Sequence, residues 1–129
     1  MSKKPSDFEL QILGVLWESA PQTVREVRAS LTDEKERAYT SVLSVMQVME
    51  KKGYLRREKA GSGNADLWSP AVDRAAVTSP LIRGWVQQLF GGRPSAVMQQ
   101  LLDGDSVDAS EVAEIRRLLK EYESNNDVS

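Results

Sequence analysis

The sequence predicts a mainly α protein of the α+β class: a winged helix-turn-helix domain followed by a helical arm. Three observations predict this class. Apolar residues recur at helical spacing in three segments within residues 6–52. Two short segments with strand composition follow, and a Gly-rich turn joins them. Further amphipathic helical segments fill the rest, so we expect one domain over residues 1–72 and a helical region over residues 73–129.

The composition of the 129 residues excludes several classes of function. The chain has no cysteine and no histidine, which removes disulfides, thiolate metal sites and the commonest general base. Its carboxylates are not grouped, so we expect neither an enzyme nor a bound cofactor or metal. No apolar run approaches the roughly 20 residues of a membrane span, and no signal-peptide pattern opens the chain. These absences favour a cytoplasmic protein.

The first two helices are predicted from their start and stop signals. Ser6 is followed three residues later by Glu9, which is the pattern of a capping box at a helix start. Pro21 cannot continue that helix, so the chain turns there. Thr23 and Glu26 repeat the capping-box pattern at the start of the second helix.

The third helix is predicted within residues 39–52, after a charged loop at 32–37. One of its faces is apolar and consists of Val42, Val45, Met46 and Met49. The opposite face carries short polar side chains, namely Thr40, Ser41, Ser44 and Gln47, with Val48 and Lys51 beside them. Short side chains let a helix backbone approach base edges in a major groove, where hydroxyl and amide groups can form hydrogen bonds. The alternative is an ordinary solvated helix surface.

A basic corner, residues 51–59, follows the polar face. Gly53 ends the helix, residues 54–59 and 65–72 are the predicted strands, and residues 60–64 form the turn between them. In a winged helix such a corner flanks the phosphate backbone of DNA, so we predict phosphate contacts from its five cations, Lys51, Lys52, Arg56, Arg57 and Lys59.

The charge is unevenly divided along the chain. Residues 1–59 contain 11 Lys and Arg against 9 Asp and Glu, and residues 60–129 contain 6 against 10, which gives the net charge of −2. This division fits a nucleic-acid-facing first part and an acidic second part with another task.

Ordered motifs along the chain resemble the penicillinase-repressor family of BlaI-, MecI- and CopY-type regulators. SDFELQILGVLWE and PQTVREVRASL are similar to the first two helices of the family, and AYTSVLSVMQVMEKKGYL is similar to its recognition helix. LWSPAV resembles the second wing strand, and LFGGRPSAVMQQLL resembles the dimerisation region. The resemblance covers roughly residues 6–123.

This resemblance implies a homodimeric transcriptional repressor that binds double-stranded DNA at inverted-repeat operators. It implies base reading by Thr40, Ser41, Ser44 and Gln47, with Lys51 and Lys52 beside them. Many members carry a basic residue where this chain has Val48, so the affinity or the operator preference is expected to differ.

The C-terminal half carries more apolar surface than short helices can bury against one another. Pro80 removes a backbone donor, so we predict a short turn over 73–77 and a helix that begins at Pro80 with Ser79 as its cap, where the family usually has one continuous helix. Pairing with a second copy would bury the apolar side chains. The predicted dimerisation residues are Leu81, Trp85, Leu89, Phe90, Val97, Leu101, Ile115, Leu118, Leu119 and Tyr122. The alternative is a monomer that folds back on itself.

Two induction mechanisms are associated with the family. The copper-responsive branch senses metal through cysteines, which this chain lacks. In the β-lactam-responsive branch, a membrane-bound sensor protease system cuts an Asn-Phe bond in the dimerisation region. The equivalent bond here is Gln100–Leu101, where the second residue is still apolar but the pair is not preserved.

Two other functions remain open from the sequence. A winged-helix protein–protein module would use the same scaffold without specific DNA binding, and the acidic composition favours it. A small-molecule sensor would need a pocket between the two halves, which Trp68, Trp85 and Phe90 could line, although aromatic residues at this spacing usually belong to a core.

Overall fold

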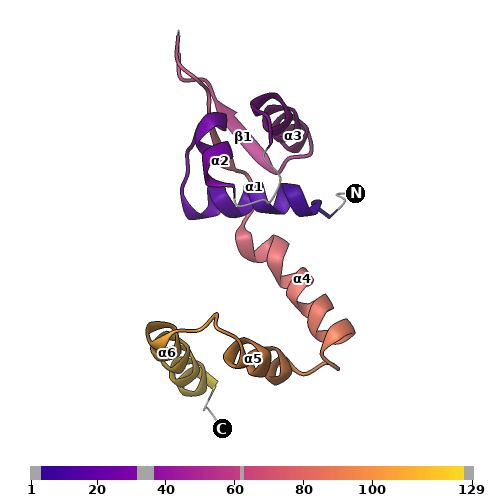
Figure 1. Cartoon of the computed structure of the whole chain (residues 1–129), viewed down its shortest axis with the longest axis vertical. Helices are drawn as coiled ribbons and strands as arrows, with labels where there is room; N and C mark the ends of the chain where they lie inside the picture. Colours follow the sequence, from indigo (N-terminus) through magenta and orange to yellow (C-terminus); the bar gives the residue numbers. More distant parts are fainter. Residues whose placement is uncertain (1–3, 32–36, 62, 127–129) are drawn as a thin grey trace. The chain divides into compact units, whose positions relative to one another are not determined.

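The computed structural model describes residues 4–31, 37–61 and 63–126, and it confirms the predicted fold class (Figure 1). Most of the predicted loop at 32–37 lies outside the described residues. The chain divides into two compact units, Met1–Thr78 and Ser79–Ser129, which we describe separately. The predicted boundary after residue 72 stays a prediction. The elements, in order, are α1 (Asp7–Glu18), α2 (Val24–Ser30), α3 (Tyr39–Lys51), β1 (Leu55–Glu58), β2 (Leu67–Pro70), α4 (Arg74–Leu89), α5 (Pro94–Asp103) and α6 (Ala109–Asn126).

Both predicted capping boxes are confirmed. The Ser6 hydroxyl accepts a hydrogen bond from the Glu9 backbone N–H at 3.2 Å, and the Glu9 carboxylate accepts one from the Ser6 N–H at 2.8 Å. Thr23 and Glu26 form the same pair of bonds at 3.1 and 2.8 Å. These bonds satisfy N–H groups that a helix start otherwise leaves without a partner. They fix where α1 and α2 begin.

The end of α3 has a Schellman motif. Gly53 has a φ of 87°, a left-handed conformation that favours glycine because it has no Cβ. The Tyr54 N–H donates to the Met49 carbonyl at 2.9 Å, and the Gly53 N–H donates to the Glu50 carbonyl at 3.1 Å. The chain therefore turns from α3 directly into β1.

The two strands form an antiparallel hairpin that reaches beyond the three helices (Figure 1). Arg57 pairs with Trp68 across it, and Arg56 pairs with Ser69. Gln22, in the connection between α1 and α2, adds an isolated bridge to Trp68, with backbone hydrogen bonds of 2.8 and 3.0 Å. The base of the wing is thereby bonded to the helix-turn-helix, as in a winged-helix domain.

One core holds the first unit together. It takes side chains from α1, α2, α3 and the hairpin, and the indole N–H of Trp17 donates to the Val72 carbonyl at 3.0 Å at its edge. Burial of this apolar set is the main favourable contribution to folding. The buried residues are Ile12, Leu13, Leu16, Val24, Val27, Val42, Met46, Met49, Tyr54, Leu55 and Trp68.

The predicted helix start at Pro80 is wrong. The helix α4 runs from Arg74 and contains Pro80 in its interior, in place of the predicted turn over 73–77 and the predicted cap at Ser79. A proline in a helix removes one hydrogen bond and crowds the preceding turn, but helical residues on both sides can outweigh that cost. The Thr78 hydroxyl, near the proline, donates to the Arg74 carbonyl at 2.9 Å. The family resemblance, with its continuous helix, was the better guide here.

The second unit leaves much of its apolar surface exposed. Among the described residues, the pairs of elements that pack extensively all involve α1, α2, α3 and the hairpin, and none joins α4, α5 and α6. The Asp108 carboxylate caps the start of α6, since it accepts a hydrogen bond from the Glu111 N–H at 2.9 Å. The exposed large apolar residues of this unit are Ile82, Trp85, Leu89, Leu101, Leu102, Leu118, Leu119 and Tyr122.

Candidate nucleic-acid interface

The polar face of α3 is open to solvent while its apolar face is fixed in the core. Val42, Met46 and Met49 are fully buried, which sets the rotation of the helix about its axis. All four predicted base-reading residues are consequently exposed, and they are Thr40, Ser41, Ser44 and Gln47. The structure therefore brings these four together on one surface, as their spacing requires.

The C-terminal end of α3 is held by α1. The ammonium group of Lys52 lies 3.0 Å from the Glu9 carboxylate, whose side chain is buried. Burial opposes ionisation of Glu9, but hydrogen bonds from the Ser6 N–H and from Lys52, together with the Lys52 charge, outweigh it and lower the pKa of the Glu9 carboxyl. Glu9 thus caps α1 and anchors the residue after α3 at the same time.

Arg57 is engaged within the domain. It lies on the same strand face as the buried Leu55, because side chains alternate along β1. Its guanidinium nitrogens lie 3.0 Å from the Glu50 carboxylate on α3 and 3.6 Å from Asp66 beside β2. The guanidinium carbon also lies 4.8 Å from the centroid of the Trp68 ring. Arg57 therefore connects the wing to the end of α3.

The other cations of the basic corner face solvent. Arg56 follows the alternation of β1 to the exposed side, and Lys51 and Lys59 are exposed as well. Among the residues that the structure describes, these three form no ion pair. Their charges remain available to an anionic partner, while the charges of Lys52 and Arg57 are partly neutralised.

A groove beside the polar face of α3 includes residues that the sequence analysis did not single out. Its volume is about 490 Å³, and Gln47 of α3 and Arg57 of the wing both line it. Arg25 of α2 and Tyr39 at the start of α3 lie on its walls, and both are exposed. The sequence shows only that Arg25 is on the outer side of its helix. Its place beside Gln47 follows from the packing of α2 on α3.

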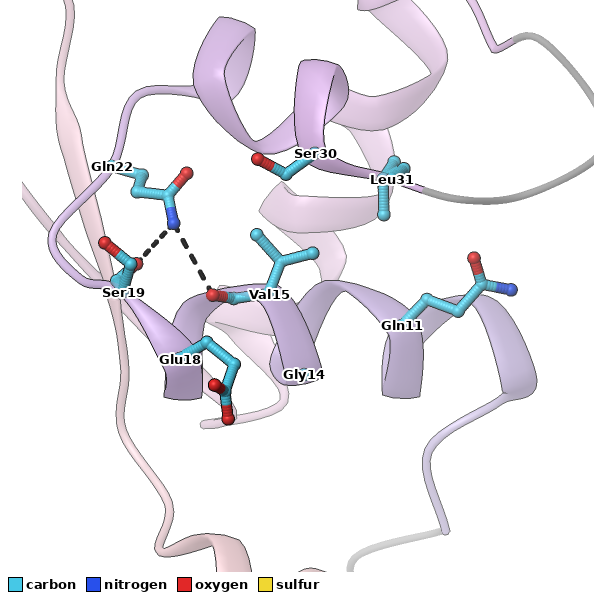
Figure 2. A pocket seen from close by; sticks show the side chains of 8 residues that line it. All are labelled: Gln11, Gly14, Val15, Glu18, Ser19, Gln22, Ser30 and Leu31. Carbon is cyan, nitrogen blue, oxygen red and sulfur yellow. Dashed lines mark hydrogen bonds between the residues drawn. The ribbon is translucent and has the colours of Figure 1, made fainter. Parts of the chain in front are cut away.

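A second hollow, of about 410 Å³, lies between α1 and α2 (Figure 2). The Gln22 side-chain amide crosses one side of it and donates to the backbone carbonyls of Ser19 and Val15, the latter at 3.5 Å. None of the predicted DNA-contacting residues lines this hollow. It belongs to the α1–α2 connection and not to the candidate interface.

The predicted dimerisation residues lie on all three C-terminal helices and at their ends. Trp85, Leu89, Leu101, Leu118, Leu119 and Tyr122 are exposed, whereas Leu81, Phe90, Val97 and Ile115 are partly buried. Gln100 and Leu101, the predicted cleavage pair, are both exposed and lie within α5.

The described part of the chain has no group of three or more acidic, histidine or cysteine side chains that could hold a metal ion. None of the helices in the described residues is both long and apolar enough to cross a membrane.

Comparison with known proteins gives consistent matches. The sequence model of the penicillinase repressor family matches residues 5–121. The penicillinase repressor of Bacillus licheniformis is 21% identical over 126 residues, which cover 96% of this chain and 97% of that protein. The transcriptional regulator BlaI of Mycobacterium tuberculosis is 28% identical over 123 residues, covering 93% and 86%. A solution structure of the B. licheniformis BlaI monomeric form, in complex with the blaP half-operator, matches with a TM-score of 0.47 and 23% identity, over 58% of this chain and 89% of that chain.

Proposed function

Because this chain belongs to the penicillinase repressor family, we propose that it is a DNA-binding transcriptional repressor that acts in the cytoplasm. We propose that it binds an inverted-repeat operator as a homodimer. The observation that carries this proposal is the exposed polar face of α3, whose opposite side is buried in the core. Next to it are three cations, Lys51, Arg56 and Lys59, that form no ion pair with any residue the structure describes. The curated relatives are named as a repressor and as transcriptional regulators, which supports the same function.

In this proposal α3 enters the major groove. Thr40, Ser41, Ser44 and Gln47 then read base edges through their hydroxyl and amide groups, which can both donate and accept hydrogen bonds. Phosphates are contacted by Lys51, Arg56 and Lys59. Lys52 contributes less, because Glu9 neutralises part of its charge. Arg57 is reassigned from phosphate contact to the positioning of the wing, because its guanidinium group is occupied by two carboxylates and an indole ring.

Dimerisation is the proposed task of the second unit. In the single chain, large apolar side chains of α4, α5 and α6 are exposed to water. A symmetric partner would cover them, and a two-fold protein matches a two-fold operator. The doubled set of base contacts would raise both affinity and specificity.

The test is fluorescence anisotropy with the full-length protein and DNA from upstream of its own gene. We expect binding at least about 10³-fold tighter than to a scrambled duplex, with affinity that falls steeply as salt rises. Equal and weak binding to both duplexes would contradict the repressor assignment and favour a winged-helix protein–protein module.

Cleavage at Gln100–Leu101 by a membrane-bound sensor protease system stays a proposal for induction. Because the bond lies inside α5, a protease needs that helix to unfold locally before it can cut. Incubation of the repressor with its sensor protease, followed by mass spectrometry, tests this directly. If no fragment ends near residue 100, the inducing signal acts in another way.

A further inference from the structure

One apolar side chain interrupts the exposed polar face of α3. The surrounding residues at helical spacing are polar, and they are Thr40, Ser41, Ser44, Gln47 and Lys51. Val48 lies among them with 46% of its surface exposed. It follows Ser44 by four residues, so both side chains lie in one row along the helix.

Helix propensity does not account for a valine at this place, and Val48 is not part of the core. Valine is a weaker helix former than the lysine or glutamine that exposed positions usually carry. The core below is completed by Met46 and Met49, both fully buried. Val48 borders a shallow hollow of about 290 Å³, which is also lined by Ser44, Val45 and Lys52 and, at the start of α1, by Ser6, Phe8 and Glu9. Nearly half of its surface remains open to whatever covers the polar face.

The chemistry of the major groove offers one apolar group. Each base pair presents hydrogen-bond donors and acceptors there, and only thymine adds a methyl group, at C5. An apolar side chain among hydrogen-bonding ones therefore matches a thymine among the bases that α3 covers. Contact with Val48 would remove both the valine and the thymine methyl groups from water.

We propose that Val48 is a specificity-determining residue that reads a thymine methyl group in each half-operator. This inference rests on the proposed function, since it requires α3 in the major groove. Ser44 and Val48 are separated by about 6 Å along the helix axis, so the thymine lies near the base that Ser44 contacts.

Replacement of thymine by deoxyuridine tests this proposal, because it removes the C5 methyl group and keeps every hydrogen-bonding group. The full-length protein is titrated, by fluorescence anisotropy, with its native operator and with duplexes that carry deoxyuridine at one symmetric pair of positions at a time. For one pair we expect a loss of affinity of about threefold to fivefold per half-site, the effect of one methyl group. For Val48→Ala that loss should disappear.

The matched control is Val45→Ala, the same change at a residue of α3 that packs against the core. It should retain the deoxyuridine penalty, and circular dichroism checks that both variants are folded. Specific binding with no deoxyuridine penalty, or an unchanged penalty in Val48→Ala, would overturn the inference and leave the repressor function intact. Failure of the wild-type protein to prefer its operator would instead overturn both.

Discussion

Trp68 and Trp85 are the same residue type, but one is buried and the other is exposed. Trp68, on β2 of the wing, is 1% exposed and belongs to the core of the first unit. Trp85, on α4 in the second unit, is 54% exposed. The first unit buries its apolar side chains within one chain, whereas the second unit leaves many of its apolar side chains exposed to solvent. This difference supports the proposal that the first unit folds by itself and that the second unit pairs with a second copy.

The largest expected effect comes from truncating the two tryptophans. Trp68→Ala should lower the free energy of unfolding by about 3–5 kcal/mol, because it leaves a large cavity in the core. Trp85→Ala should change the unfolding of the first unit little and weaken self-association. Urea denaturation followed by circular dichroism measures the first effect, and sedimentation velocity measures the second. Equal destabilisation by both changes would contradict the distinction between the units.

A second test addresses the exposed face of α4 alone. Leu89→Glu should convert the proposed dimer into a monomer, because each leucine removed from water contributes about 1.5–3 kcal/mol and the symmetry repeats the loss. Gln88→Glu adds the same charge one position away and is the control. The molar mass of each variant, determined by light scattering, shows whether it is a dimer or a monomer. If Leu89→Glu remains dimeric, the face of α4 is not part of the interface.

Buried and exposed carboxylates offer a third comparison. Glu9→Gln should cost about 1–3 kcal/mol near neutral pH, since it removes an ionised acceptor for Ser6 and Lys52. The folded-state pKa of Glu9 is lowered from its ordinary value of 4.5, so the folded protein binds fewer protons than the unfolded chain there. The stabilisation is therefore complete above the ordinary pKa of 4.5, and it is lost as pH falls through the lower folded-state pKa.

The control for Glu9 lies on α6. A hydrogen bond from Arg117 lowers the pKa of the Glu114 carboxyl, but both side chains are exposed. Glu114→Gln should therefore leave the unfolding free energy unchanged within error at every pH. Urea denaturation between pH 3 and 7 compares the two variants. A pH-independent effect of Glu9→Gln would show that its charge is not the cause.

The smallest expected effect separates two adjacent arginines. Arg56→Ala should reduce the slope of log affinity against log salt by about 0.9 per half-site, because one phosphate contact is lost. Arg57→Ala should weaken operator binding through a displaced wing and leave that slope unchanged. Anisotropy titrations over a salt series measure both quantities. A reduced slope for Arg57→Ala would show that Arg57 contacts a phosphate.

Sequence reasoning was most successful where interactions are local. The capping boxes of Ser6 and Thr23 join groups three residues apart, so their spacing predicts them. The apolar row that contains Val42 and Met46 predicts which side of α3 is buried. Pro80 shows the limit of a local rule, because the helix around it continues in spite of one missing donor.

The rest of the site depends on contacts between distant residues. Arg57 and Arg56 look alike in the sequence, and only the register of β1 and the positions of Glu50 and Asp66 distinguish them. The pairing of Glu9 with Lys52 spans most of the first unit along the chain. No pattern within a short window reports such pairs, so the division of the basic corner into engaged and free cations required the structure.

The bridge between Gln22 and Trp68 has a consequence for how such a domain can vary. Because the base of the wing is bonded to the α1–α2 connection, changes in the hairpin turn are separated from α3, the proposed base-reading helix. Insertions and deletions at residues 60–64 should therefore be tolerated, and each would alter the reach of the wing along the DNA backbone. If α3 and the wing act as proposed, operator length and operator sequence are changed independently, by different segments of the chain.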